Sequence, residues 1–130
     1  MAQIEVDQLT QLQIDWVIAT MECFEPFVTK AVAVFATGTN DYGPYSPTTS
    51  REKGGYILER EKISTLWCPD LNCWGAKSAL LSANAPNSFG ETPLIAGLRC
   101  FIKETRGDVV TISDAVLEAL SRTRADVANN

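Results

Sequence analysis

The clearest pattern of hydrophobic and polar positions lies between residues 90 and 107. Apolar side chains recur there with the spacing of one helical face, at Leu94, Ile95, Leu98, Phe101 and Ile102. A second, basic stripe is formed by Arg99, Lys103 and Arg106. Thr92 is a suitable N-cap, Pro93 falls at the first helical position, and Gly107 can end the helix. The pattern therefore predicts an amphipathic helix against which the rest of the chain packs.

Two further helices are predicted, one near each end of the chain. Thr10 and Gln13 fit a capping box, so a helix should run from about Gln11 to Met21. Most positions of this segment are apolar, which predicts that the helix is largely buried. Ser113 is the expected cap of a last helix over residues 114–121.

Short apolar runs predict β-strands at Ile4–Val6, Phe27–Ala36, Tyr56–Leu58, Ile63–Trp67, Trp74–Ala79 and Val109–Ile112. The charged residues 59–62 are interpreted as a hairpin turn, and Asn84–Gly90 as a turn-rich linker. Because short turns favour antiparallel pairing, we expect an α+β fold with a small, mostly antiparallel sheet and two or three helices packed on one face. Residues 1–124 are predicted to form a single domain, and residues 125–130 a frayed C-terminal tail.

The longest stretch without a periodic pattern is Thr37–Gly55, which is rich in Gly, Pro, Ser and Thr. Irregular connections of this length are uncommon in compact domains and are often functional. Tyr42 and Tyr45 lie within it. Each ring could stack on a planar ligand or fold back onto the core, and the sequence leaves both interpretations open.

Composition and charge limit the classes of partner. The 130-residue chain is 45% hydrophobic and 21% charged, as in globular proteins, and its formal net charge is −5. An acidic chain lacks the basic footprint of a general nucleic-acid binder. No apolar run approaches the length of a membrane-spanning helix, and the N-terminus has no signal pattern. We therefore expect a cytosolic protein with neither nucleic acid nor a membrane as a partner.

The chain contains four cysteines, Cys23, Cys68, Cys73 and Cys100, and no histidine. Without a secretion signal, reduced thiols are expected. The C-x4-C spacing of Cys68 and Cys73 could hold a metal ion or form a disulfide. Zinc would need two more ligands, which only the other cysteines or carboxylates could provide. We therefore predict neither a metal site nor a cofactor.

The absence of histidine from the sequence also removes the commonest catalytic arrangements. A Ser-His-Asp triad and a Cys-His pair are both impossible. The sequence contains no phosphate-binding loop and no dinucleotide-binding glycine pattern after a strand. No pair of carboxylates stands out among the 16 acidic residues. We therefore predict no catalytic residues and a protein that is not an enzyme.

The functional groups that remain suit ligand binding. The predicted ligand-binding residues are Tyr45, Ser46, Thr48, Gly54, Gly55, Trp74 and Arg99. The aromatic rings offer flat surfaces, the two hydroxyls offer hydrogen bonds, and the glycines allow a close backbone approach. The arginine could bind a phosphate bidentately. Each group also has a structural interpretation, as a turn residue, a bend, a sheet-packing ring or a surface ion pair.

Six blocks of the sequence, in order across most of residues 9–112, resemble motifs of the NinX-like small proteins of tailed phages. Ile14–Ala19 resembles L-D-W-x-V-A, Tyr45–Thr48 resembles Y-S-P-S/T, Gly54–Ser64 resembles G-G-P-I-I-E-R-E-x-I-S, Trp74–Ala76 matches W-x-A, Gly90–Ile102 resembles G-x-T-P-L-I-A-A-M-R-C-Y-V, and Gly107–Val110 resembles G-D-x-V. No single block is specific, but the ordered set is. Tyr56 stands where the family pattern has proline.

The resemblance implies a phage accessory protein, of a family without known function, in the cytoplasm of an infected bacterial host. Some small phage proteins sequester nucleotide-derived immune signals, such as cyclic oligonucleotides or ADP-ribose derivatives. By this analogy, the leading hypothesis is an anti-defence protein that binds a small nucleotide-like ligand without cleaving it. We expect it to be a homo-oligomer with the pocket near a subunit interface. The alternatives are an inhibitor that binds a host defence protein and, third, a nucleotide-turnover enzyme.

Overall fold

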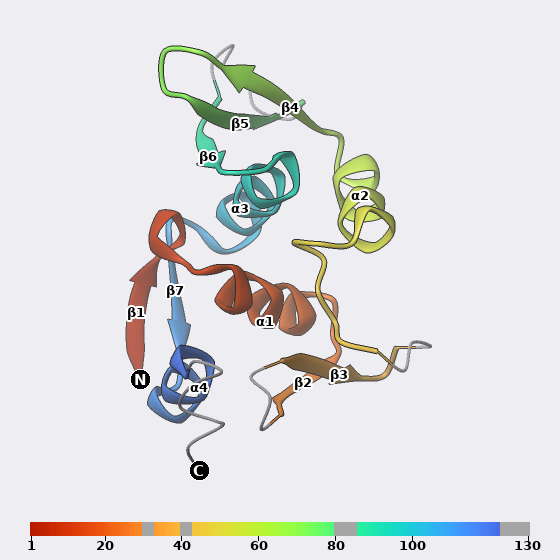
Figure 1. Ribbon diagram of the computed structural model, residues 1–130, viewed down its shortest axis with the longest axis vertical. Helices are drawn as coiled ribbons and strands as arrows, with labels where there is room; N and C mark the ends of the chain where they lie inside the picture. Colours follow the sequence, from red (N-terminus) through yellow and green to blue (C-terminus); the bar gives the residue numbers. More distant parts are fainter. Residues whose placement is uncertain (30–32, 40–42, 80–85, 123–130) are drawn as a thin grey trace.

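The computed structural model describes residues 1–29, 33–39, 43–79 and 86–122. Within these ranges the chain forms α1 (Gln11–Met21), α2 (Arg51–Arg60), α3 (Pro93–Arg106) and α4 (Asp114–Ser121), with a 3-10 turn, η1 (Val6–Gln8), before α1. Helix α3 lies at the centre of the molecule and contacts both α1 and α2 (Figure 1). None of the helices in this part of the chain is long and apolar enough to cross a membrane.

The described strands form three small antiparallel sheets. Strand β1 (Ala2–Glu5) pairs with β7 (Val109–Ile112), β2 (Glu25–Val28) pairs with β3 (Val34–Thr37), and the third sheet has the order β4 (Ile63–Cys68), β5 (Cys73–Ser78), β6 (Ser88–Gly90). The predicted α+β class is therefore confirmed. The strands are divided among three sheets around α3, whereas a single sheet with helices on one face was predicted.

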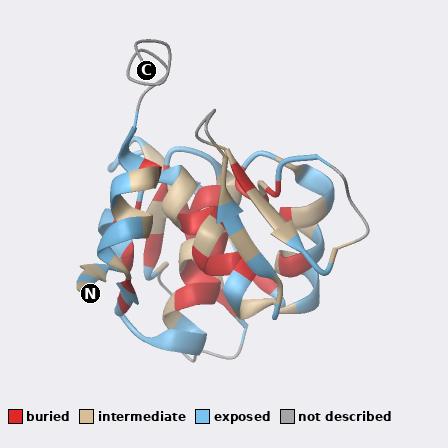
Figure 2. Cartoon of the chain, turned by 90° about the horizontal axis from the view of Figure 1, so that it is seen from below, coloured by how far each residue is buried: buried red, intermediate tan, exposed pale blue. Residues whose placement is uncertain are grey.

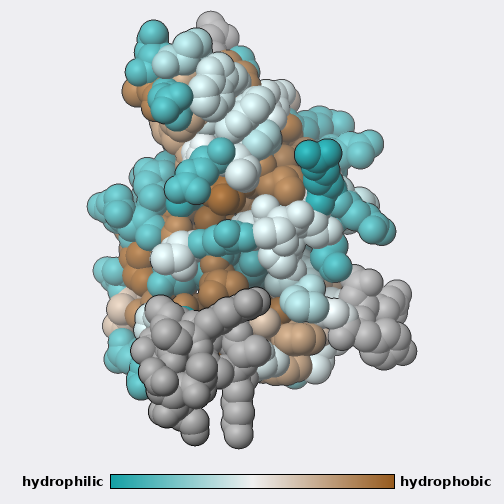
Figure 3. All heavy atoms as spheres, viewed as in Figure 1, coloured by the Kyte–Doolittle hydropathy of each residue, from teal (hydrophilic) through white to brown (hydrophobic). Residues whose placement is uncertain are grey.

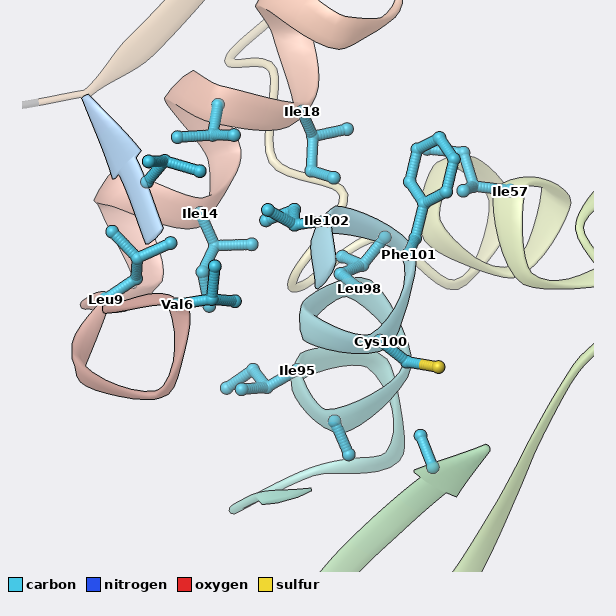
Figure 4. Packing of buried hydrophobic residues seen from close by; sticks show 14 of the residues in the cluster. Val6, Leu9, Ile14, Ile18, Ile57, Ile95, Leu98, Cys100, Phe101 and Ile102 are labelled. Atoms are coloured by element: carbon cyan, nitrogen blue, oxygen red, sulfur yellow. The ribbon is translucent and has the colours of Figure 1, made fainter. Parts of the chain in front are cut away.

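Helix α3 supplies the middle of the hydrophobic core. Ile102 of α3 points toward Ile14 and Ile18 of α1, whereas Phe101 lies on the side of α2 (Figure 4). Figure 2 shows the buried residues gathered between the helices, with exposed positions around the outside of the molecule. The predicted amphipathic helix and its role as the packing centre are thus confirmed.

The predicted caps of three helices are also confirmed. The Thr92 side chain accepts a hydrogen bond from the first turn of α3, and Gly107 ends the helix with a φ of 90°. Thr10 and Gln13 form the expected capping box at α1. The Ser113 side chain caps α4. These signals are local, so the sequence alone is enough to predict them.

Residues 51–60 form a helix that the sequence pattern did not predict. Two predictions are therefore wrong, the strand Tyr56–Leu58 and the hairpin turn at residues 59–62. The predicted irregular stretch Thr37–Gly55 is wrong in its last five residues, whereas residues 43–50 form neither a helix nor a strand. The Ser50 side chain caps α2, and Ile57 is buried whereas Tyr56 is 63% exposed. Such an unequal burial of neighbours is typical of one helical face, and three consecutive apolar residues cannot distinguish a strand from a helix.

The other predicted elements agree in part with the structure. Strand Val109–Ile112 is confirmed with the predicted ends as β7. Strands Ile4–Val6, Ile63–Trp67 and Trp74–Ala79 are confirmed, with shifted ends, as β1, β4 and β5. The single strand predicted over Phe27–Ala36 is wrong, because this segment contains parts of two strands that pair with each other. The predicted linker Asn84–Gly90 contains strand β6. Tyr42, residues 84–85 and the predicted tail at 125–130 lie outside the described residues.

Candidate functional site

Ser46 and Thr48 meet at a buried carboxylate that the sequence pattern did not single out. This carboxylate belongs to Asp15 of α1, which is 0% exposed. Its Oδ2 accepts hydrogen bonds from Ser46 Oγ (2.9 Å) and Thr48 Oγ1 (3.0 Å). Its Oδ1 accepts one from the Thr48 backbone N–H (3.0 Å). Both hydroxyls that were predicted to bind a ligand therefore donate to Asp15.

Burial controls the charge of Asp15. Desolvation raises its pKa from 3.8 to about 6, while the hydrogen bonds from Thr48 and Ser46 act in the opposite direction. The side chain is therefore ionised at neutral pH, and uncharged donors stabilise it. Because a fully buried acid is rare unless its oxygens are paired, an Asp in an apolar helix is itself the signal that could have revealed this contact.

Gly54 lies where α2 packs against the same loop. A Cβ at this position would lie 2.2 Å from the Pro47 carbonyl oxygen and 2.9 Å from Leu94 Cδ2, so only glycine fits without a shift. At Gly55 nothing lies within 4 Å of the corresponding position. The glycine pair was predicted to let the backbone approach a ligand closely. At Gly54 the backbone instead approaches the Pro47 carbonyl of the same chain.

Tyr45 lines a cleft of about 390 Å³, a volume within the range of small-molecule sites. The other lining residues are Glu22, Phe24, Gly38, Thr39, Lys53, Tyr56 and Ile57. The Tyr45 ring is 6% exposed and packs edge-on against Phe24, with the ring centroids 5.6 Å apart. Burial raises the pKa of the Tyr45 hydroxyl, which is therefore uncharged at neutral pH. This tyrosine forms the wall of the cleft.

Helix α2 contributes three residues to the cleft that were not predicted, Lys53, Tyr56 and Ile57. The Arg60 guanidinium lies 5.6 Å from the centroid of the Tyr56 ring. Ion pairs to Glu22 (2.8 Å) and Glu61 (2.7 Å) hold Arg60 in place. The interpretation of this segment as a loop followed by a strand concealed the helical spacing that brings these side chains to one face.

Thr48 and Gly55 line a separate groove of about 700 Å³ at the start of α3. Arg51, Glu91 and Leu94 lie around it. The groove therefore contains two of the predicted ligand-binding residues but none of the predicted aromatic ones.

Trp74 lies on β5 and packs within the three-stranded sheet. Its ring is edge-on to that of Trp67 on β4, with the centroids 5.6 Å apart. Trp74 is partly buried against the hydrophobic core. These contacts correspond to the sheet-packing interpretation of this residue.

Arg99 projects from α3 into a third pocket, of about 570 Å³, which shares no lining residue with the Tyr45 cleft. Its two terminal nitrogens donate to the carbonyl oxygens of Phe89 (2.6 Å) and Leu9 (2.9 Å). Burial lowers the pKa of Arg99, and among the described residues its Nε has no hydrogen-bond partner. The guanidinium thus joins β6 to the segment that leads into α1.

The cysteines do not form a cluster in the structure. Cys68 and Cys73 are register partners at the end of the β4–β5 hairpin, and all four cysteines are free thiols. Within the described ranges, no group of three His, Cys, Asp or Glu side chains could hold a metal ion.

The predicted ligand-binding residues are therefore distributed over the Asp15 contact, the groove, the sheet and two pockets. A family sequence model described as Bacteriophage P22, NinX matches residues 5–104. The matched range includes Asp15, Ser46, Thr48 and the Tyr45 cleft. No curated protein matches the chain.

Proposed function

This chain belongs to the phage P22 NinX family, and from that membership and the cleft beside Tyr45 we propose that it is a phage anti-defence protein. In this proposal it binds a small nucleotide-derived immune signal of the host and withholds that signal without cleaving it. It acts in the cytoplasm of the infected bacterium as a homo-oligomer, and it needs no cofactor.

The observation that carries the proposal is the combination of side chains in the Tyr45 cleft. Tyr56 provides an aromatic ring that is 63% exposed, and Lys53 provides an ammonium group in the same cleft. A flat ring can stack on a nucleobase, and an ammonium group can pair with a phosphate. The cleft thus has the two kinds of group that a nucleotide-like ligand needs.

The proposed complex assigns new roles to several residues. Tyr56 stacks on the base and Lys53 pairs with a phosphate, while Tyr45 and Phe24 form the apolar wall. The residues that the sequence suggested for the sugar and phosphate, Ser46, Thr48 and Arg99, hold the scaffold through the contacts with Asp15 and with the backbone. Trp74 acts in sheet packing rather than in stacking.

The chemistry of the buried acid supports binding without turnover. A general base must lie within hydrogen-bond reach of the substrate proton that it removes. Both oxygens of Asp15 already accept hydrogen bonds, and the side chain is 0% exposed. The sequence contains no histidine to take this role.

Substitution of Tyr56 tests the proposed site. Isothermal titration with cyclic dinucleotides, cyclic trinucleotides and ADP-ribose should identify a ligand. Tyr56→Ala should then weaken its binding about 10- to 100-fold, because base–aromatic stacking contributes about 1–3 kcal/mol. Tyr56→Phe keeps the ring and should bind nearly as tightly as the natural chain.

Trp67→Ala is the matched control, because Trp67 is an exposed aromatic residue of the β4–β5 hairpin, 47% exposed, outside the cleft. It should leave the affinity unchanged. Equal losses in Tyr56→Ala and Trp67→Ala, or no loss in the former, would contradict this assignment of the cleft.

A second candidate function, inhibition of a host defence protein by direct binding, is favoured by one surface feature. Phe27 of β2 is 45% exposed, and its ring stacks on Phe35 of β3 with centroids 5.7 Å apart. Exposed aromatic residues are enriched at protein interfaces. If this function is correct, the protein should retain a stoichiometric partner from host lysate, and Phe27→Ala should lose that partner while keeping the small ligand.

A further inference from the structure

Strand β4 has a partner on only one side among the described strands. In an antiparallel pair, the backbone N–H and C=O groups of successive residues point alternately toward and away from the partner strand. Ala79 N donates to Lys62 O (3.1 Å), and together with the β4–β5 register this hydrogen bond shows which residues of β4 point toward β5. The even-numbered residues of β4 direct their N–H and C=O groups toward β5. Ile63, Thr65 and Trp67 therefore direct theirs outward, where a further strand could pair with them.

This edge lacks the features that usually prevent strand pairing. The six residues of β4, Ile-Ser-Thr-Leu-Trp-Cys, include no charged residue and no proline. Leu66 is 37% exposed and Trp67 is 47% exposed. The hairpin projects at one end of the molecule in Figure 1, and Figure 3 shows pale to brown surface along it with hydrophilic groups near its tip. Among the residues that the structure describes, the edge is therefore open to an uncharged partner strand.

We propose that this partner is β4 of a second copy of the chain, paired antiparallel about a two-fold axis at Leu66. In this register Thr65 of each copy lies opposite Trp67 of the other, and the outward backbone groups of the two residues form hydrogen bonds. A β-branched residue opposite an aromatic one is a favourable cross-strand pair. The same surface serves both copies, as a two-fold interface requires.

Charge complementarity favours this register and a second copy as the partner. Lys62 precedes β4, Asp70 lies in the turn after it, and both are exposed. Pairing about Leu66 brings Lys62 of each copy to the turn that carries Asp70 of the other, so opposite charges face each other at both ends of the interface. Pairing about Thr65 also matches donors with acceptors, but it sets Lys62 opposite Cys68 and loses this complementarity. The dimer joins the two sheets at an edge that is separate from the Tyr45 cleft.

Sedimentation velocity across the micromolar to millimolar range tests the proposal. The natural chain should show a concentration-dependent dimer, and the amide N–H groups of Thr65 and Trp67 should exchange with deuterium more slowly as the concentration rises. Leu66→Lys should weaken the dimer at least about ten-fold, because it sets two like charges opposite each other at the axis. Val109→Lys is the matched control, since Val109 is 44% exposed but lies on β7, in another sheet.

Charge reversal tests the register itself. Lys62→Asp and Asp70→Lys should each weaken the dimer, and the double variant should restore it. Aspartate tolerates the left-handed backbone at residue 62, where φ is 57°. Circular dichroism of each variant checks whether the fold is kept.

Three outcomes would overturn the proposal: a monomer at every concentration, a dimer as sensitive to Val109→Lys as to Leu66→Lys, or a double charge reversal that restores nothing. A chain that stays monomeric but binds a strand of another protein at this edge would also overturn it.

Discussion

Asp15 shows how the role of a residue depends on partners that lie far away in the sequence. Its hydrogen-bond partners Ser46 and Thr48 follow it by 31 and 33 positions. The two family-like blocks Ile14–Ala19 and Tyr45–Thr48 therefore meet at one carboxylate. The sequence shows that both blocks are present, but only the folded chain brings the hydroxyls to the acid, and it thereby removes them from the predicted ligand site.

The stability of the protein should depend on pH through Asp15. Its pKa is 3.8 unfolded and about 6 in the native state, so the native state binds more protons between these values. The contribution of this group is most favourable below pH 3.8, falls as the pH rises to about 6, and is constant above. The difference of about two pKa units corresponds to about 3 kcal/mol.

Asp15→Asn isolates this effect, because an amide cannot titrate. Its oxygen can accept from the Thr48 N–H, and its NH2 group can donate to the Ser46 and Thr48 hydroxyl oxygens. Denaturant unfolding at a series of pH values should show that the free energy of unfolding of the variant, relative to the natural chain, rises across this window. A difference that does not change with pH would show that Asp15 has an ordinary pKa.

Arg99 should matter more for stability than for any ligand. Arg99→Met removes the donors to Phe89 O and Leu9 O and leaves two carbonyl groups without their charged partner. The expected loss in the free energy of unfolding is about 2–4 kcal/mol, measured by chemical denaturation. Arg106→Met is the control, because Arg106 is an exposed residue of the same helix, and it should cost less than about 0.5 kcal/mol. Equal effects of the two substitutions would contradict the structural role.

At the scale of elements, helices with local start and stop signals could be predicted and α2 could not. The caps at Thr10, Thr92 and Ser113 lie directly beside apolar positions with helical spacing. In α2 the first half, Arg51–Gly55, contains no apolar side chain and ends in two glycines, which normally disfavour a helix. Gly54 is required by a tertiary contact, because its backbone packs against the Pro47 carbonyl oxygen. No local pattern reveals this contact.

The packing of α2 on α3 depends on small residues in the same way. A Cβ at Gly97 would lie 2.6 Å from Leu58 Cδ1. Glycine at position 97 therefore lets the Leu58 side chain of α2 approach the backbone of α3 closely.

The two glycines of α2 should respond to substitution in opposite ways. Gly54→Ala should destabilise the protein by about 1–3 kcal/mol, because the new methyl group meets the Pro47 carbonyl oxygen and forces the loop to shift. Gly55→Ala should be neutral or stabilise it by up to about 1 kcal/mol, because alanine favours a helix and nothing lies near its Cβ. Chemical denaturation measures both values. A gain in stability from Gly54→Ala would contradict the helix position.

At the scale of the whole molecule, local patterns do not predict which strands pair with each other. Strand β1 pairs with β7 through Gln3 and Thr111, from opposite ends of the chain, while β2 and β3 pair within one short segment. Most strands could be located from their apolar runs, but their assignment to three sheets depends on packing around α3. The Tyr45 cleft, too, is made by elements that are separate in sequence, so its residues Lys53 and Tyr56 could not be grouped with Tyr45 beforehand.

Capture and release of a ligand test the central claim most directly. The purified protein is mixed with a labelled cyclic dinucleotide or ADP-ribose, separated from free ligand, and heated until it unfolds, and the released material is identified by mass spectrometry. The account predicts retention up to a fixed ratio per chain, and recovery of the ligand chemically unchanged. Sustained consumption of the ligand over many turnovers, or the absence of any retained signal from the whole panel, would contradict it.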